Sequence, residues 1–279
     1  MSQERNEGIS HAFMRTGAHK TLRLTETGKE TAMPEREQMI EGRNAVLEAL
    51  RAERSVDRVL IQDGVKEGAI GSIIREVKKH PETKLEFVLK KKLDDLSETG
   101  RHQGVIAWTA AYDYSSVEDI LARAREKGED PFIFILDGIE DPHNLGAIIR
   151  TANLCGAHGV IIRLNRAVGL TAIVSKASAG ALNYTPVAKV TNISSTIDAL
   201  KKEGLWFVCA DMGGETMYRL NLKGPIGLVI GNEGKGVSEL VRKNCDMIAS
   251  IPMFGDIDSL NASVAAGVLA YEIVRQRLS

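Results

Sequence analysis

The chain has 279 residues and a formal net charge of −1, from 36 basic and 37 acidic side chains. Hydrophobic residues make up 43% of it and charged residues 26%, which is typical of a globular protein of about two domains. A near-neutral charge excludes a polybasic nucleic-acid binder, although a local basic face is still compatible with such a partner. No apolar run approaches the ~18 residues of a membrane-spanning helix, so we expect no membrane partner.

The cysteines and histidines show no pattern of a disulfide framework or a metal site. Cys155, Cys209 and Cys245 lie far apart among apolar residues, and no histidine pair has the spacing of metal ligands. An odd, scattered set of cysteines favours free thiols in a reducing compartment. A zinc site would need paired ligands at short spacing, so we expect no metal. Because no secretory signal stands at the N-terminus, we expect a cytoplasmic protein.

Residues 1–38 differ in composition from the rest of the chain. They hold six basic and six acidic residues, few large apolar side chains and no sustained hydrophobic period. Such a segment has little apolar surface to bury, which predicts a flexible N-terminal extension.

The hydrophobic pattern becomes regular at residue 39. Val46, Leu47 and Leu50 share one face of a predicted helix, and a similar stripe follows further on. The pattern predicts a small α/β domain over 39–110, followed by a linker and a helix over 111–130. Within this part, helices are expected over 41–52, 68–79, 91–96 and 117–127, and strands over 56–61, 85–89 and 104–109.

Residues 131–279 alternate strands and helices. The strand predicted over 132–136 is apolar on both faces, which is typical of a parallel sheet covered by helices on both sides. We therefore predict an α/β domain whose ligands bind beyond the carboxyl ends of the strands. Further strands are expected over 159–162, 206–210, 226–230 and 248–251, and helices over 145–154, 173–181, 193–202, 238–243 and 261–278.

Three polar, glycine-containing junctions follow strands of this predicted sheet, at 137–150, 231–238 and 251–263. The second junction is not a Walker A loop, because Val229 and Gly236 stand where that motif needs glycine and Ser or Thr. Its glycine spacing is also the reverse of the dinucleotide-binding fingerprint. Each junction alone is a weak signal, since glycine clusters often only form turns.

Five side chains in these junctions are candidates for chemistry, and most also have a plain structural explanation. Asn144, Ser259 and Asn261 are ordinary helix-capping residues. Arg150 can form a surface ion pair or, given its place in a largely apolar helix, a buried functional contact. Glu233, an acid between glycines after a buried strand, is a candidate orienting group or hydrogen-bond acceptor.

Taken together, the three junctions resemble the SpoU (TrmH) family of SAM-dependent ribose 2′-O-methyltransferases of the SPOUT superfamily, over residues 132–279. The matching residues are Asn144, Gly146, Arg150, the run 231–234, Ile251, Pro252 and the run 259–261. Residues 39–109, with 42–44 and 102–104, resemble the L30e-like RNA-binding domain that often precedes this family's catalytic domain. The chain after residue 38 is similar to the RlmB type of bacterial 23S rRNA guanosine 2′-O-methyltransferases.

The resemblance implies several features of the second domain, 131–279. It implies a Rossmann-like parallel sheet with a deep trefoil knot, and a homodimer whose active sites are built from both subunits. It also implies that S-adenosyl-L-methionine (SAM) binds in a bent form, against main-chain groups of Gly231, Ile251 and Leu260. The catalytic set that it implies is Asn144, Arg150, Glu233, Ser259 and Asn261.

The chemistry of methyl transfer suggests roles for this set. The sulfonium methyl of SAM is already activated, so the enzyme must mainly position a ribose 2′-hydroxyl and remove its proton. Arg150 either grips an RNA phosphate bidentately or accepts the proton; a pKa above ~12 makes the grip the favoured role. Glu233 is expected to orient Asn144 or Arg150. His143 is the alternative general base, ranked below Arg150.

Two other functions stay open at this point. One is a related tRNA or antibiotic-resistance rRNA 2′-O-methyltransferase. The other is a non-catalytic RNA-binding factor in ribosome assembly, which the small domain would support and the complete catalytic set disfavours.

Overall fold

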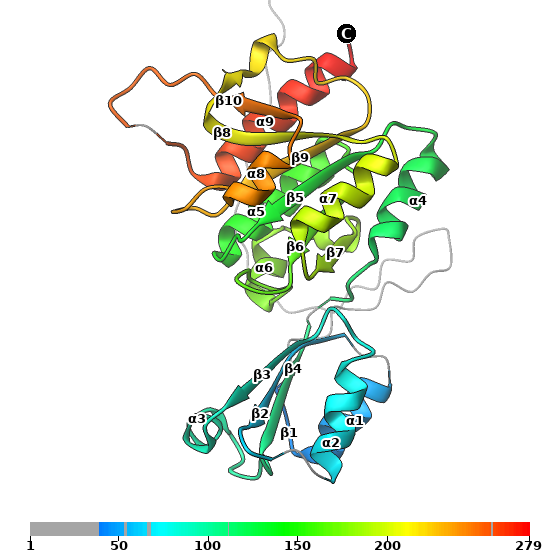
Figure 1. Ribbon diagram of the computed structural model, residues 1–279, viewed down its shortest axis with the longest axis vertical. Helices are drawn as coiled ribbons and strands as arrows, with labels where there is room; N and C mark the ends of the chain where they lie inside the picture. Colours follow the sequence, from blue (N-terminus) through cyan, green and yellow to red (C-terminus); the bar gives the residue numbers. More distant parts are fainter. Residues whose placement is uncertain (1–38, 53–54, 66–67, 111, 258) are drawn as a thin grey trace, which may run out of the picture. The chain divides into compact units, whose positions relative to one another are not determined.

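The computed structural model describes residues 39–279, apart from 53–54, 66–67, 111 and 258. The extension predicted over 1–38 lies outside the described residues. Over the described part the chain forms a four-stranded sheet and a six-stranded sheet, each with its own helices (Figure 1). None of the described helices is long and apolar enough to cross a membrane.

The four-stranded sheet has the order β1-β4-β2-β3, with β2 and β3 parallel and the other pairs antiparallel. Helices α1 and α2 pack through Val46, Leu50, Ile70 and Ile73 on one face of this sheet. The short strand β1 was not predicted, because three residues are too few to show a period. The elements are β1 (Met39–Glu41), α1 (Arg43–Arg51), β2 (Val56–Gln62), α2 (Ala69–Val77), β3 (Lys84–Val88), α3 (Lys90–Leu96) and β4 (Val105–Thr109).

The six-stranded sheet has the order β10-β8-β9-β5-β6-β7, and all its strand pairs are parallel. This confirms the predicted α/β class with a parallel sheet. Its elements, after α4 (Val117–Lys127), are β5 (Phe132–Asp137), α5 (Pro142–Leu154), β6 (Gly159–Arg163), α6 (Ala172–Ala177), β7 (Val187–Val190), α7 (Ile193–Lys202), β8 (Trp206–Thr216), β9 (Ile226–Gly231), α8 (Glu239–Lys243), β10 (Met247–Ser250) and α9 (Ala262–Arg277), with short 3₁₀ turns at Ala181–Asn183 and Met217–Arg219.

The central strand β5 shows why this sheet is covered on both faces. Side chains alternate along a strand, so Phe132, Phe134 and Leu136 join a core with α5 and α9. Ile133 and Ile135 point the other way, into a second core with α4, α7 and α8. All six residues of β5 are buried. Both layers of helices therefore hold the carboxyl end of β5, and the loop after it, in a fixed place.

Two elements of the large sheet differ from the prediction. Strand β7 was missed, because it is a four-residue edge strand that includes Lys189 and gives no continuous apolar run. Strand β8 runs six residues beyond the predicted end, through Gly213 and Gly214. A Cβ added at Gly214 would lie 2.2 Å from the carbonyl oxygen of Ile248 on β10, so glycine permits this close pairing.

A buried histidine ties the start of β5 to the residue before β6. His158 is fully buried, and its Nδ1 accepts a hydrogen bond from the Phe132 amide at 3.0 Å. Its Nε2 lies 3.0 Å from Glu129 Oε2. Burial lowers the pKa of His158, outweighing the opposing effect of Glu129, because the charged imidazolium is disfavoured in an apolar core.

This histidine should make stability depend on pH. A folded-state pKa below the unfolded value stabilises the fold fully above about 6.5, and that stabilisation is lost as the pH falls towards the folded-state pKa. Urea unfolding at pH 7.5 and 5.5 should therefore show a smaller pH effect in His158→Asn than in the parent. The control is His143→Asn, at an exposed histidine. An unchanged pH effect in His158→Asn would contradict this reading.

Candidate active site

A cavity of about 470 Å³ lies where β8, β9 and β10 meet the segments that follow them. Its size falls within the range of ~300–1,000 Å³ that small-molecule sites usually have. The apolar residues Ile230, Ile251 and Leu260 form part of the wall, and residues 231–237 form another part. The lining residues are Ala210, Asp211, Met212, Ile230, Gly231, Asn232, Glu233, Gly234, Lys235, Gly236, Val237, Ala249, Ile251, Met253, Ser259, Leu260, Ala262, Ala265 and Leu269.

The cavity brings together all three positions for which the resemblance implied SAM contacts, Gly231, Ile251 and Leu260, along with Glu233 and Ser259. Ile251 and Leu260 belong to the segment between β10 and α9, which extends away from the sheet before returning (Figure 1). The loop after β9 and the segment before α9, about twenty residues apart in the sequence, thus line the same cavity.

The loop after β9 owes its shape to Asn232. The Oδ1 atom of Asn232 accepts from the amides of Gly234 and Lys235, at 3.0 and 3.1 Å. Its Nδ2 donates to the carbonyl oxygen of Gly138 at 2.8 Å, which ties this loop to the loop after β5. Backbone hydrogen bonds between Asn232 and Gly236 close the turn. The sequence predicted no role for Asn232, because its contact with Gly138 spans 94 positions.

Gly231 allows this loop to fold back on itself. A Cβ at position 231 would lie 2.2 Å from backbone atoms of Gly236 and Val237, far inside van der Waals contact. The glycine is needed for the turn itself, rather than for space inside the cavity.

Replacing Gly231 with alanine should therefore destabilise the loop by roughly 1–3 kcal/mol, the usual cost of overpacking. The matched control is Gly234→Ala in the same loop, where the nearest atom to an added Cβ is Asn232 Oδ1, at an ordinary 3.7 Å. Thermal unfolding should show a lower Tm for Gly231→Ala and little change for Gly234→Ala. Equal Tm values for the two variants would contradict the close approach.

Three of the five candidate catalytic side chains form one hydrogen-bonded chain beside the cavity. Asn144 Nδ2 donates to Glu233 Oε1 at 3.0 Å. Asn144 Oδ1 accepts from Asn261 Nδ2 at 2.9 Å. Asn144 is only 6% exposed, so this central amide has both of its polar atoms satisfied by the two neighbouring loops. Each of the three sequence junctions supplies one member of the chain.

The helix-capping explanation fails for Asn144 and holds for Asn261. Helix α5 begins at Pro142, and Asp141 caps it by accepting from the His143 amide. Asn144 lies inside the first turn, which leaves its side chain free to bond elsewhere. Asn261 does cap α9, since its Oδ1 accepts from the Ser263 amide while its Nδ2 bonds Asn144. Ser259 is exposed and lines the cavity, and it is not the cap of α9.

Arg150 does not join this group, and the predicted buried contact is wrong. Its side chain is exposed, with no hydrogen bond or ion pair to the described residues. Six residues along a helix turn the side-chain direction by about 240° relative to Asn144, so the two point to different sides of α5. Ile149 and Thr151 are sequence neighbours of Arg150, but they lie on other faces of the helix.

The described residues contain no group of three or more acidic, histidine or cysteine side chains placed to hold a metal ion. Cys155, Cys209 and Cys245 are free thiols. The pKa of the Cys209 thiol is raised, by its hydrogen bond with Cys245 and by burial. None of the three thiols is among the residues that line the cavity.

Comparison with known proteins agrees with this fold. Residues 131–271 match the SpoU rRNA methylase family, and residues 39–115 match the substrate-binding domain of RNA 2′-O ribose methyltransferases. A Bacillus subtilis protein named "Putative TrmH family tRNA/rRNA methyltransferase YacO" is 45% identical over 247 residues, 88% of this chain and 98% of that protein. A relative of the same family from Staphylococcus saprophyticus is 43% identical over 86% of this chain and 96% of its own.

Solved structures give the same result. The SpoU methyltransferase AviRb from Streptomyces viridochromogenes, in complex with the cofactor AdoMet, is 28% identical with a TM-score of 0.56. The match covers 87% of this chain and 91% of AviRb. A structure described as an RNA 2′-O ribose methyltransferase is 26% identical, with a TM-score of 0.51, over 88% of this chain and 90% of its own. The chain belongs to the SpoU rRNA methylase family and is an RNA methyltransferase.

Proposed function

We propose that this protein transfers the methyl group of SAM to the 2′-hydroxyl of a guanosine ribose in 23S rRNA. The observation that carries the proposal is the chain Glu233–Asn144–Asn261, in which three loops converge beside one cavity. AviRb, a structural neighbour that covers most of the chain, was solved with AdoMet bound. The small domain matches a family described as binding RNA substrate.

The cavity fits SAM in size and in chemistry. Its apolar wall at Ile251 and Leu260 suits the adenine ring, and the backbone of the Gly231 loop offers hydrogen-bonding groups. Asp211 and Lys235 at its edge can meet the charged ends of the amino acid part. When bound, SAM supplies a methyl group that its sulfonium charge has already activated.

The residues around the cavity then have to place one oxygen atom and handle one proton. Alignment of the reacting atoms can supply ~7–11 kcal/mol of the barrier. Asn144 holds Glu233 and Asn261 at a fixed separation. We propose that these three hydrogen-bonded side chains, together with Ser259, position the ribose. Methyl transfer would break the sulfur–methyl bond of SAM as the 2′-oxygen bonds to the methyl carbon, leaving S-adenosylhomocysteine, and the 2′-hydroxyl proton would pass to water.

Arg150 is proposed to grip the RNA phosphate next to the target ribose. Its guanidinium is exposed and has no partner among the described residues, so it can form two parallel hydrogen bonds to a phosphate.

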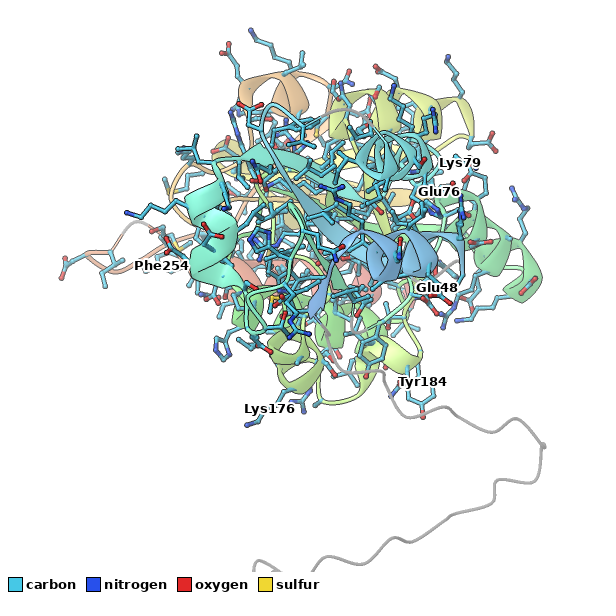
Figure 2. The ribbon with its side chains drawn as sticks, turned by 90° about the horizontal axis from the view of Figure 1, so that it is seen from below. Glu48, Glu76, Lys79, Lys176, Tyr184 and Phe254 are labelled. Carbon is cyan, nitrogen blue, oxygen red and sulfur yellow. The ribbon has the colours of Figure 1, made fainter. Side chains whose placement is uncertain are left out.

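We propose further that the protein is a homodimer and that Arg150 acts in the site of the partner subunit. Exposed apolar side chains lie on the same helix as Arg150, at Leu154, and on α9, which contacts α5, at Val264 and Tyr271. Phe254, in the segment before α9, is 97% exposed (Figure 2). Such surfaces commonly mark a protein interface. Sedimentation equilibrium should give twice the chain mass; the mass of one chain would overturn this proposal.

The proposed C-terminal trefoil knot has support in the chain path. The chain leaves β9 for β10 at the sheet edge, beyond β8, and α9 then returns to pack against α5 in the middle. A knot of this kind is an exception to the general rule for protein chains. A crystal structure whose C-terminal trace pulls straight without threading a loop would overturn it.

We propose that residues 39–110 present the RNA, that residues 131–279 methylate it, and that residues 111–130 connect the two parts. The free thiols and the RNA substrate both suit the cytoplasm. Mapping ribose methylation in rRNA and tRNA from a deletion strain tests the target. Loss of a 2′-O-methylguanosine in 23S rRNA is expected; loss of a methyl group in tRNA alone would overturn the rRNA assignment.

Binding of SAM is the simplest test of the proposed function. At a concentration of ~100 Kd, a ligand that binds the folded state stabilises it by ~2.7 kcal/mol. Thermal unfolding with SAM and with S-adenosylhomocysteine should show this shift. No shift with either compound would favour a non-catalytic RNA-binding factor.

A further inference from the structure

One buried carboxylate beside the site has no part in the proposed methyl transfer. Asp137 is the last residue of β5, and its side chain is 2% exposed. A buried charge is costly unless hydrogen bonds or an opposite charge compensate it. Its position, at the carboxyl end of the central strand, is where the sheet places its ligand loops.

The partners of this carboxylate all come from chain segments around the site. Asp137 Oδ2 accepts from the Ser238 amide at 2.9 Å and from Ser238 Oγ at 2.5 Å. Arg163 Nη1 at the end of β6 lies 3.4 Å from the other carboxylate oxygen, Oδ1. Both oxygens of Asp137 therefore have partners: Oδ2 accepts two hydrogen bonds from Ser238, and Oδ1 makes a longer contact with the Arg163 guanidinium.

Through these contacts and its strand pairing, Asp137 holds both ends of the 231–238 loop in place. Gly231, at the start of the loop, is the β-sheet partner of Asp137 in the β5–β9 ladder. Ser238, at its other end, is held by the Asp137 carboxylate. The residues between them, 231–237, line the cavity, and Glu233 among them reaches Asn144.

We propose that Asp137 is a positioning residue for cofactor binding: its carboxylate fixes the 231–238 loop in the shape that receives SAM and holds Glu233 against Asn144. The inference rests on the proposed function and deepens it. The carboxylate is required, rather than only a side chain of that size, because it accepts hydrogen bonds at both oxygens, whereas a carboxamide has one acceptor oxygen.

Asp137→Asn is the direct test, with binding of SAM measured by calorimetry. The Kd for SAM should rise about tenfold to a hundredfold, since displacement of a loop by about 1 Å can cost that much. The milder variant Ser238→Ala removes the hydroxyl contact and keeps the amide contact, so its Kd should rise by a smaller factor. In the double variant the two effects should be less than additive, because both changes break the same contact.

Asp246→Asn is the matched control. Asp246 also accepts from a backbone amide and a cation, Phe207 N at 2.8 Å and Lys201 Nζ at 2.7 Å, but it lies before β10, outside the cavity lining. Its loss should lower Tm without changing the Kd for SAM.

The outcomes separate this inference from the function on which it rests. A parent protein that does not bind SAM overturns both. A parent that binds SAM, with Asp137→Asn binding it equally well, overturns only the role of Asp137. Equal weakening in Asp137→Asn and Asp246→Asn would also overturn it, because the effect would then reflect general stability.

Discussion

Replacing Asn144 with alanine should lower kcat/KM for RNA methylation by about a hundredfold to a thousandfold. The side-chain amide of Asn144 joins the loops that carry Glu233 and Asn261, through hydrogen bonds of 3.0 and 2.9 Å. Without this amide, no hydrogen bond from residue 144 holds Glu233 and Asn261 in position. A small misplacement of catalytic groups can lower the reaction rate by ~10²-fold. The rate of methyl incorporation into rRNA at saturating SAM measures the effect.

Asn144→Asp tests whether the site needs the amide donor of residue 144, because aspartate has nearly the same shape but carries a negative charge. Aspartate keeps the acceptor for Asn261 but replaces the donor to Glu233 with a second carboxylate, so the two acids repel each other. Activity should fall as in the alanine variant. The control is Asn153→Ala on the same helix, whose side chain donates to Thr185 Oγ1 instead. An Asn144→Ala enzyme with the parent kcat/KM would contradict the role assigned to this residue.

Arg150→Lys should lower kcat/KM for RNA by about tenfold to a hundredfold, while the Kd for SAM stays at the parent value. Lysine keeps the positive charge but cannot form the two parallel hydrogen bonds of a guanidinium to a phosphate. Because Arg150 is exposed and unpaired among the described residues, the change should leave Tm almost unaffected. Methylation kinetics at several RNA concentrations measure the effect; a parent rate would contradict the bidentate contact.

Mixing Arg150→Ala with Asn144→Ala, two variants that should each have very little activity alone, tests whether the sites are shared between subunits. A mixed dimer of Arg150→Ala and Asn144→Ala chains would contain one site with both residues intact, if Arg150 serves the partner subunit. Activity should then return when the two proteins are unfolded and refolded together. If both residues act within one chain, the mixture stays inactive, and the arrangement proposed for Arg150 is wrong.

The sequence predicted the class of fold and the convergence of the three junctions for a physical reason. Buried parallel strands such as β5 are apolar along their whole length, and their carboxyl ends must share one edge. That edge places Asn144 and Glu233 together, although 89 residues separate them.

Other features could not be predicted, because they depend on contacts between distant segments. The exposure of Arg150 follows from the rotation of α5, which its sequence neighbours do not reveal. The roles of Asn232 and Asp137 depend on backbone groups of Gly138 and Ser238 that only folding brings near. A polar residue at the end of a buried strand, as Asp137 is, was the one available signal.

The position of the transferred methyl group tests the central claim most directly. The purified protein is incubated with SAM carrying an isotope-labelled methyl group and with 23S rRNA, and the RNA is digested and analysed by mass spectrometry. We predict label on the ribose of a guanosine, at an alkali-resistant linkage, incorporated about a hundredfold to a thousandfold more slowly by Asn144→Ala. Label on a base, or unlabelled RNA from a protein that binds SAM, would contradict the account.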